Sequence, residues 1–303
     1  HPIEVAGILA SLHMDVQSVC TALLHDVLED TDTDHAQLTE LFGLEIADLV
    51  NGVTKLGQLE LSNPDATRER KQAENFQKFV LAMSRDIRVL IVKLCDRLHN
   101  MRTLDFHPKE ESRRRIARET LDIYAPLARR IGVDRIVTEL EDLSFKHLQP
   151  GVYENITKRL AAWRAGQDVA ISQMSVAIRD LMDQHDVHSK VYGREKRAYA
   201  IWRKLDRQGI TFEDVADIYA FRIIVDDIPT CYRVLGMLHT TFRCVPARFR
   251  DFISVPKPNG YQSVHTTILS PDNTRMEIQI RTARMEDVAG RCVAAHWAYN
   301  NQS

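Results

Sequence analysis

The sequence lacks the features by which several classes of protein are recognised. Its 303 residues include five cysteines at wide spacings and no C-x-x-C pair, so the sequence suggests neither a disulfide framework nor a thiolate zinc site. No apolar run approaches the roughly 18 to 20 residues needed to cross a bilayer, and no signal peptide stands at the start. We therefore expect a cytoplasmic protein in a reducing compartment, with no membrane partner.

An excess of charge of one sign is also missing. The chain has 40 basic and 42 acidic residues, which give a formal net charge of −2 at pH 7. A surface that binds nucleic acid through bulk charge needs a clear excess of lysine and arginine. We therefore expect no direct nucleic-acid binding, and any phosphate-binding site must be local.

Glycine and proline are sparse, at 12 and 10 residues, and they mark the expected breaks between helices. From Ile3 to about His185 the apolar residues recur at helical spacing, so this half is predicted to be all-helical. The expected breaks are at Gly43, Gly52, Asn63-Pro64, His107-Pro108, Gly132 and Gln149-Pro150-Gly151. The polar segment 57–74 is predicted to be a mobile loop between helices.

After about Tyr192 the pattern changes. Residues 218–225 and 276–280 are β-branched and aromatic runs of strand length, and residues 230–241 between them have helical spacing. The second half is therefore predicted to be α/β. The boundary between the two halves is expected near residues 165 to 190.

A first group of chemically active residues surrounds a His-Asp dipeptide. If residues 20–31 form one helix, four polar groups fill one arc of it and apolar residues fill the other. The four are His25, Asp26, Glu29 and Asp30. Carboxylates clustered in this way repel unless a cation lies among them, so a divalent metal ion is an economical partner. A solvated acidic face is the alternative, and His185-Asp186 shows that the dipeptide alone is not specific.

A further candidate ligand lies on a second helix. The helix predicted over residues 89–104 carries polar residues along one side, namely Lys93, Asp96, Asn100 and Thr103. A carboxylate on a buried stripe needs a partner. For Asp96 that partner is either a metal ion or a salt bridge to Lys93 or Arg97, and the residues alone leave the choice open.

Four segments of the first half form an ordered set: HPIEVAGILA (1–10), LLHDVLEDTD (23–32), VNGVTKL (50–56) and VKLCDRLHNMRTL (92–104). They resemble the hydrolase domain of the RelA/SpoT stringent-response enzymes. The resemblance implies an HD-type (p)ppGpp hydrolase domain over residues 1–150. It also implies that a metal ion, typically Mn²⁺, is held by His1, His25, Asp26 and Asp96, a mixed nitrogen and oxygen shell that suits this ion.

The implied reaction is hydrolysis of the 3′-pyrophosphate. A water molecule of lowered pKa attacks phosphorus, and Glu29 and Asp30 accept or relay its proton as pyrophosphate departs. By the same resemblance, Asn100 and Thr103 contact the nucleotide.

A basic cluster opens the second half. The segment GREKRAYAIWRKL (193–205) contains Arg194, Lys196, Arg197, Arg203 and Lys204. This charge is enough to bind a triphosphate, and a solvated helix face is the alternative.

Two carboxylates follow the basic cluster. Asp217 opens one predicted strand, and Glu277 shares one side of another with Gln279 and Arg281. Two carboxylates beside a basic cluster suit Mg²⁺-assisted phosphoryl transfer.

The segment FRDFISVPKPNGYQSVHTT (249–267) contains a Lys-Pro-Asn-Gly turn followed by Tyr261 and His265. The side chain of Tyr261 suits a stacking platform, and that of His265 suits a hydrogen-bond donor to phosphate. An ordinary hairpin is the alternative. Together with CVAAHWAY (292–299), the segments resemble, in order, the (p)ppGpp synthetase domain of the same family. The resemblance implies a nucleotidyltransferase-like, mixed-sheet domain over residues 191–303, after a helical linker over residues 151–190.

The resemblance also implies roles for these residues. Tyr261 would stack on guanine, and Asp217 and Glu277 would bind Mg²⁺. Glu277 would also activate the acceptor 3′-hydroxyl of GDP or GTP. The phosphates of ATP would be held by Arg194, Lys196 and Lys204.

The chain departs from the synthetase motifs at several positions. Ala200 stands where the family has serine, and Ala247 where it has glycine; Gly290 and Cys292 stand where it has glutamate and glycine. We therefore expect synthesis to be weak or impaired. By contrast, the segment RFRD (248–251) is similar to the basic pattern of hydrolase-competent members, which favours the SpoT branch.

Our main hypothesis is a Mn²⁺-dependent guanosine-3′,5′-bis(diphosphate) 3′-pyrophosphohydrolase that releases GDP and pyrophosphate. The alternatives are a fully bifunctional enzyme, which also transfers pyrophosphate from ATP to GDP or GTP, and a non-catalytic guanine-nucleotide-sensing module. An HD phosphodiesterase acting on nucleic acid is disfavoured by the near-neutral charge. Full-length family members carry C-terminal regulatory domains, which are absent after Ser303. The uncapped start at His1 suggests that the chain begins inside a larger protein.

Overall fold

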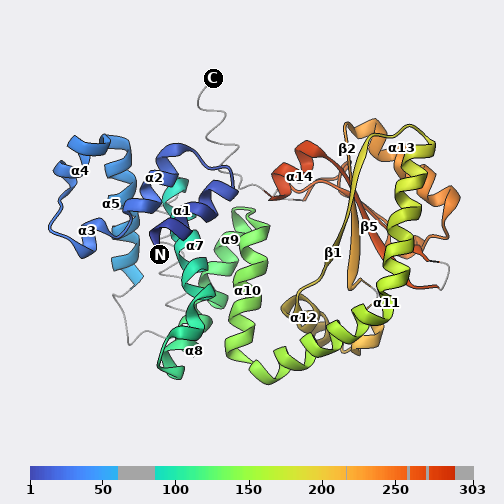
Figure 1. Ribbon diagram of the computed structural model, residues 1–303, viewed down its shortest axis with the longest axis horizontal. Helices are drawn as coiled ribbons and strands as arrows, with labels where there is room; N and C mark the ends of the chain where they lie inside the picture. Colours follow the sequence, from blue (N-terminus) through green and yellow to red (C-terminus); the bar gives the residue numbers. More distant parts are fainter. Residues whose placement is uncertain (61–85, 216, 258–259, 271–272, 291–303) are drawn as a thin grey trace. The chain divides into compact units, whose positions relative to one another are not determined.

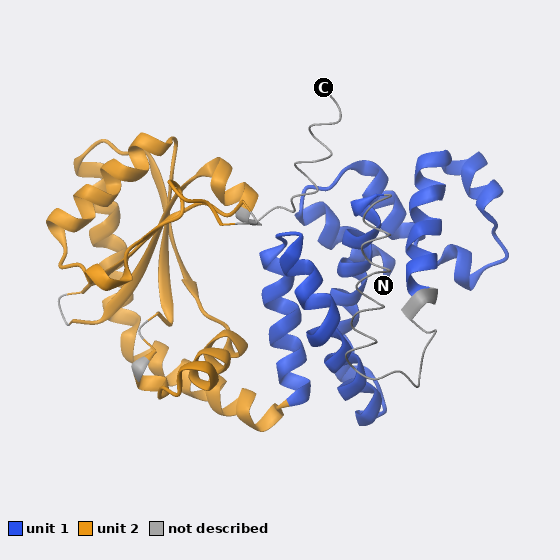
Figure 2. Ribbon diagram, turned by 180° about the vertical axis from the view of Figure 1, so that it is seen from behind, with its two compact units in different colours: residues 1–148, 290–303 blue, residues 149–289 orange. Residues whose placement is uncertain are grey.

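The computed structural model describes residues 1–60, 86–215, 217–257, 260–270 and 273–290 (Figure 1). Two compact units make up the chain, and residue 149 begins the second (Figure 2). Among the described helices, none combines the length and the apolar character that a membrane span requires.

The described part of the first unit, residues 1–148, is entirely helical, as predicted. Its α-helices are α1 (Pro2–Ser11), α2 (Val16–Leu24), α3 (Val27–Asp30), α4 (His35–Phe42), α5 (Leu44–Glu60), α7 (Ile87–Arg102), α8 (Glu110–Glu119), α9 (Ala125–Arg130) and α10 (Asp134–Leu148). A 3-10 turn, η1 (Leu104–Phe106), follows α7, and a π-helical turn, η2 (Thr120–Tyr124), joins α8 to α9.

Helix α7 is the centre of the first core. Its apolar residues, from Val89 to Met101, are buried, and it contacts α1, α2, α5 and α10. Because apolar side chains surround most of this helix, it is covered by neighbours on nearly every side. Of the charged residues of α7, Asp96 is the one that is buried, at 5% exposure.

Two predictions about helix breaks are wrong. Gly52 lies inside α5, where a β-carbon would come 2.8 Å from Val89 Cγ2. The glycine therefore permits close packing of α5 on α7, and it does not end a helix. Residues 57–60, predicted as loop, continue α5, while the rest of the predicted loop and Asn63-Pro64 lie outside the described residues. Gly43 and Gly132 do mark breaks, with φ of 87° and 79°.

The second unit is a mixed α/β structure, as predicted. It begins with the 35-residue helix α11 (Pro150–Gln184) and contains α12 (Ala198–Gln208), α13 (Ile228–Thr241) and α14 (Ala283–Gly290). Its strands are β1 (Ser189–Glu195), β2 (Tyr219–Val225), β3 (Arg250–Asp251), β4 (Val264–Leu269) and β5 (Arg275–Thr282). The predicted strands correspond to β2 and β5, and the predicted helix between them to α13.

The five strands form one sheet in the order β1-β2-β5-β4-β3. The β2–β5 pair is parallel and the other pairs are antiparallel. Apolar residues of one face, including Phe221, Ile278 and Ile280, join a core with residues of α11 and α13. The opposite face is polar.

The register aligns one residue from each strand in a row across the sheet. The row is Tyr192, Arg222, Gln279, His265 and Arg250, in the order of the strands. On β5, Gln279 Nε2 donates to Glu277 Oε1 at 2.9 Å, and Arg281 Nη2 donates to Gln279 Oε1 at 2.8 Å. These contacts confirm the prediction that Glu277, Gln279 and Arg281 share one side of the strand.

Candidate functional sites

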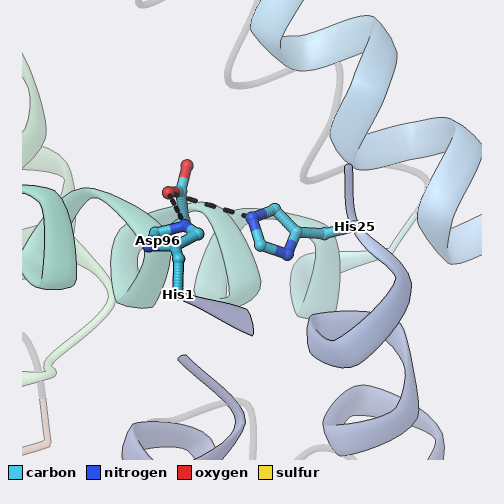
Figure 3. Close-up of side chains that lie close together, drawn as sticks. All are labelled: His1, His25 and Asp96. Atoms are coloured by element: carbon cyan, nitrogen blue, oxygen red, sulfur yellow. Dashed lines mark hydrogen bonds and ion pairs between the residues drawn. The ribbon is translucent and has the colours of Figure 1, made fainter. Parts of the chain in front are cut away.

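Three of the four predicted metal ligands converge in the first unit (Figure 3). His1 immediately precedes α1, His25 follows α2, and Asp96 lies in α7, and one ligand atom of each is within 4.8 Å of the other two. His1 Nε2 lies 3.1 Å from Asp96 Oδ1, and His25 Nε2 lies 3.9 Å from the same oxygen. Residues 95 positions apart in sequence thus meet around one carboxylate oxygen.

The prediction that residues 20–31 form a single helix is wrong. Helix α2 ends at Leu24, His25 caps it, and Asp26 precedes the short helix α3. This break turns His25 inward, where its side chain is 2% exposed, while the side chain of Asp26 is 42% exposed. The four polar residues therefore do not share one solvent-facing arc.

The proton on the His25 ring is fixed by the backbone. His25 Nδ1 donates to the carbonyl of Ala22 at 2.7 Å, and because a carbonyl only accepts, the proton must be on Nδ1. A neutral ring then presents a lone pair at Nε2. That atom is buried and has no hydrogen-bond partner among the described residues, although Asp26 Oδ1 is 3.1 Å away.

This donor set fits a divalent cation. A buried, unpartnered imidazole nitrogen is costly unless an ion or a donor satisfies it. Two atoms that each bind one cation at about 2.1 Å are at most about 4.2 Å apart, and the distances of 3.1 and 3.9 Å meet this limit. Nitrogen and carboxylate oxygen together suit several first-row divalent ions.

Asp96 is held on both of its oxygens. Lys93 Nζ lies 2.9 Å from Oδ2, and Asn100 Nδ2 donates to Oδ1 at 2.8 Å. Of the two salt-bridge partners considered, Lys93 is therefore the one present. Arg97 instead donates to Glu119 at 3.2 Å and to Tyr124 at 2.8 Å. Asp96 thus has a structural salt bridge and also belongs to the candidate metal centre.

The fourth predicted ligand, Asp26, lies at the edge of this centre, outside the group of three. Burial raises the pKa of its carboxyl, and although His25 opposes the rise, Asp96 and Asp30 add to it. Glu29 Oε1 and Lys93 Nζ both lie 3.6 Å from the place where a β-carbon on Gly57 would stand. Glu29 and Asp30, which were predicted to accept or relay the proton of water, both lie on α3, directly after Asp26.

The predicted nucleotide contacts lie at the exposed end of α7. Asn100 and Thr103 are both exposed, and Thr103 Oγ1 donates to the carbonyl of His99 at 3.1 Å. His99 itself was not among the predicted site residues. Its Nδ1 lies 2.7 Å from His1 Nδ1, and the signal for it was its position three residues after Asp96 on one helix face.

In the second unit, two predicted phosphate-binding lysines contact a predicted metal ligand. Lys204 Nζ lies 2.5 Å from Asp217 Oδ1, and Lys196 Nζ contacts Asp217 Oδ2. Burial alone would raise the pKa of Asp217, but the two ammonium groups hold it below its ordinary value. The structure therefore brings these three residues together with the carboxylate ionised.

Glu277, His265 and Tyr261 form a second connected group. Tyr261 Oη lies 2.8 Å from His265 Nε2, and His265 Nδ1 lies 3.2 Å from Glu277 Oε1. Burial would raise the pKa of Glu277, but His265 and Gln279 lower it below its ordinary value. The imidazole therefore links the predicted stacking residue to the predicted catalytic carboxylate.

The ring of Tyr261 is bordered by cations and an aromatic ring. Lys257 Nζ and Arg281 Cζ lie 4.9 and 5.4 Å from its centroid, and Phe252 packs against it edge-on. Burial raises the pKa of Tyr261. Part of the Lys-Pro-Asn-Gly turn, residues 258–259, lies outside the described residues.

The basic segment 193–205 is split between two elements. Arg194 is on β1, where it is exposed, and Lys204 is on α12. The segment is therefore neither one helix nor one solvated face. At its start, a β-carbon on Gly193 would lie 1.7 Å from Tyr219 Oη, so the tyrosine covers the glycine directly.

A buried ionic group on the polar face of the sheet was not predicted. Arg281 is fully buried, its Nε lies 3.1 Å from Glu286 Oε2, and Arg222 Nη1 lies 3.1 Å from Glu286 Oε1. Tyr192 Oη also donates to Glu286, at 2.5 Å. Strand alternation placed Arg281 on the polar face, but its partner comes from α14, which the sequence pattern did not connect to it.

The positions that depart from the synthetase motifs are mostly exposed or terminal. Ala200 is exposed on α12, and Ala247 lies in a 3-10 turn where its carbonyl accepts from Arg250 at 3.3 Å. Gly290 is the last residue of α14, and Cys292 lies outside the described residues. The second His-Asp pair, His185-Asp186, is an exposed turn after α11.

Two family models match the chain. One, described as an HD domain, matches residues 1–134, and the other, a region found in RelA / SpoT proteins, matches residues 193–303. A GTP pyrophosphokinase of Myxococcus xanthus is 50% identical over 299 residues, which cover 99% of this chain and 39% of that protein.

Two further relatives have similar coverage. A guanosine-3′,5′-bis(diphosphate) 3′-pyrophosphohydrolase of Haemophilus influenzae is 46% identical over 99% of this chain and 43% of that protein. The bifunctional (p)ppGpp synthase/hydrolase SpoT of Escherichia coli is 45% identical over 99% of this chain and 42% of that protein. The chain thus spans less than half the length of these relatives. From the two family models and this similarity over nearly its whole length, the chain belongs to the RelA/SpoT family, as an HD domain followed by the region characteristic of these proteins.

Proposed function

We propose that the first unit hydrolyses the 3′-pyrophosphate of ppGpp or pppGpp, using Mn²⁺. One observation carries the proposal: His1, His25 and Asp96 direct ligand atoms to one point, and the buried His25 Nε2 there has no hydrogen-bond partner among the described residues. The names of the relatives from Haemophilus influenzae and Escherichia coli, which specify this hydrolysis, support the substrate.

The residues of the site have distinct tasks in this proposal. His1, His25 and Asp96 hold the cation, with Asp26 as a further ligand at its edge. A bound divalent cation supplies Lewis acidity toward water and phosphate oxygens. Glu29 and Asp30 accept the proton of the attacking water, and Asn100 and Thr103, at the exposed end of α7, contact the nucleotide.

We also propose a second, weaker activity, transfer of pyrophosphate from ATP to the 3′-hydroxyl of GDP or GTP. The ionised carboxylates of Asp217 and Glu277 favour it, since both have lowered pKa values and both suit Mg²⁺. In this proposal Glu277 accepts the hydroxyl proton, Tyr261 stacks on guanine, and His265 lies between them. The phosphates of ATP are bound by Lys196, Lys204 and Arg194.

The weakness of synthesis is inferred from departures in the supporting motifs. Ala200 lacks a hydroxyl on the exposed face of α12, and Gly290 replaces a helix-supporting residue at the end of α14. At this position the chain lacks the carboxylate of the family's glutamate, at the end of the helix that supplies Glu286 to the polar face of the sheet.

Incubation with ppGpp and Mn²⁺, followed by quantification of GDP and pyrophosphate, tests the hydrolase. We expect release that a chelator abolishes. A metal centre supplies several kcal/mol of transition-state stabilisation, so Asp96→Asn is expected to slow release by about 10³-fold. His188→Asn, at an 80% exposed side chain of the second unit, is the control. Unchanged release in Asp96→Asn refutes the proposed function.

A second incubation with ATP, GTP and Mg²⁺ separates weak synthesis from full bifunctionality. We expect slow accumulation of pppGpp that Glu277→Gln removes. Rapid accumulation, at a rate equal to hydrolysis, shows a fully bifunctional enzyme and contradicts the inferred weakness. Binding of guanine nucleotides without turnover in either tube indicates a sensing module.

A further inference from the structure

His99 is an unassigned imidazole in direct contact with a proposed metal ligand. It lies on α7, one turn from Asp96, and its Nδ1 is 2.7 Å from His1 Nδ1. The two rings meet edge to face, with centroids 4.7 Å apart. At this distance one nitrogen must carry the proton and the other must accept it.

The direction of this hydrogen bond decides what His1 offers to a cation. If His1 Nδ1 donates to His99, the neutral His1 ring has a lone pair at Nε2, the atom 3.1 Å from Asp96 Oδ1. If His99 donates, His1 Nε2 carries the proton and points it at Asp96. The first arrangement provides a metal ligand, and the second provides a salt-bridge-like contact without one.

His25 shows the same design with a different outer partner. Its Nδ1 donates to the carbonyl of Ala22, which fixes the lone pair on Nε2. His1 is the N-cap residue of α1, and the partner of its Nδ1 is the side chain of His99. A hydrogen-bond partner of this kind fixes both the tautomer and the orientation of a metal-binding imidazole.

We propose that His99 is a positioning residue, which accepts the Nδ1 proton of His1 and thereby directs the His1 Nε2 lone pair to the metal. The inference rests on the proposed function, because His1 has this role in the metal centre proposed for the hydrolase. His99 is not one of the ligands in this proposal, since its Nδ1 faces His1 and it is not part of the converging group of His1, His25 and Asp96.

The test compares two substitutions at position 99. His99→Leu removes the acceptor, and His99→Asn keeps an oxygen near the place of Nδ1. Mn²⁺ affinity is measured directly by calorimetry and by electron paramagnetic resonance of free Mn²⁺, without nucleotide. Loss of such a partner weakens metal affinity by about 10- to 100-fold, so we expect this loss for His99→Leu and substantial recovery for His99→Asn.

Controls separate positioning from folding. Thermal unfolding without metal shows whether both variants are folded. His188→Leu, at an exposed histidine of the second unit, is expected to bind Mn²⁺ as the unaltered protein does. Nitrogen-15 correlation spectra of the imidazoles report the His1 tautomer, which is expected to become mixed in His99→Leu.

The outcomes distinguish this inference from the proposed function. Unchanged Mn²⁺ affinity in His99→Leu, or equal losses in the Leu and Asn variants with both folded, overturns the role of His99 alone. Failure of the unaltered protein to bind Mn²⁺ overturns the proposed metal centre and this inference with it.

Discussion

Lys93 Nζ lies 2.9 Å from Asp96 Oδ2, one turn earlier on the same helix. The ammonium group of Lys93 therefore offsets the charge of Asp96 at Oδ2, while Oδ1 faces His1 and His25. A buried carboxylate without a partner is costly, so the pair keeps α7 stable when the metal centre has no ion. This relationship leads to the first prediction.

Replacing Lys93 with methionine is expected to make the first unit more dependent on metal. Without Lys93, Asp96 loses the ammonium group that offsets its charge. The bound ion then contributes more to stability, so Mn²⁺ should raise the melting temperature more in Lys93→Met than in the unaltered protein. The measurement is thermal unfolding with and without saturating Mn²⁺. Lys109→Met, at an exposed position, is the control. An equal Mn²⁺ effect in both proteins contradicts the prediction.

Glycine at position 52 is predicted to be required for stability, because α5 packs closely on Val89 there. Gly52→Ala places a β-carbon 2.8 Å from Val89 Cγ2, and overpacking of this kind costs about 1–3 kcal/mol. In a Val89→Ala background the same change should become neutral or stabilising, since alanine favours helix by about 1 kcal/mol. Chemical denaturation of the four proteins gives the coupling energy.

Gly57 provides the matched control in the same helix. A β-carbon there meets its nearest atoms at 3.6 Å, an ordinary contact. Gly57→Ala is therefore expected to leave stability unchanged or to raise it slightly. Destabilisation at both glycines would show that helix α5 rejects alanine for a reason other than the Val89 contact.

Glu286 is predicted to hold the second unit together through two arginines. Glu286→Gln removes the charge that offsets Arg281, which is fully buried, and Arg222. Because Glu286 is itself partly exposed, we expect a loss of about 2 kcal/mol in unfolding free energy, below the value for a fully buried pair. Asp206→Asn, at an exposed position of α12 in the same unit, is the control. Equal stability of the two variants rules out the proposed anchoring.

Asp251 should give the loop after β3 a stability that depends on pH. Burial would raise the pKa of Asp251, but hydrogen bonds from Ser254, Ile253 and Tyr232 hold it below its ordinary value. The folded pKa is depressed, so the stabilisation is present above the unfolded pKa of about 3.9 and is lost as pH falls through the folded value.

The measurement compares melting temperatures from pH 7 down to about pH 3. Asp251→Asn is expected to melt a few degrees lower than the unaltered protein near pH 7, and the difference should shrink below about pH 4. Asp206→Asn, at an exposed position, is the control. A difference that stays constant over this range contradicts the assigned cause.

Much of the fold follows from local pattern. The apolar spacing predicted the helices of the first unit, and β-branched runs predicted β2 and β5, because these elements bury one or both faces. Strand β1 was not predicted, since it is largely exposed and lacks alternation. Gly52 was taken as a break because a glycine that permits helix packing looks the same in sequence as one that ends a helix.

The candidate site was predictable in its members but not in its arrangement. Residue patterns singled out His25 and Asp96, the resemblance added His1 and a shared metal ion, and the structure brings the three side chains together. The helix breaks at His25 and Asp26, and this break depends on where each side chain finds a partner in three dimensions. Helical periodicity over residues 20–31 therefore wrongly placed the four polar residues on one side of a single helix. The contact of His99 with His1 spans 98 residues, and the sequence carries no signal for it beyond helix-face proximity to Asp96.

The row of aligned residues across the sheet, from Tyr192 to Arg250, makes the sheet intolerant of changes in the length of its strands. Gln279 pairs with Arg222 on one side and with His265 on the other, so β5 is fixed by both neighbours. Inserting or deleting one residue within β5 would shift the register on one side of the change by one, and the core residues there, such as Ile278 and Ile280, would turn toward the polar side. Substitution can therefore vary the chemistry of this face one side chain at a time, whereas a single-residue insertion would displace several of its groups together.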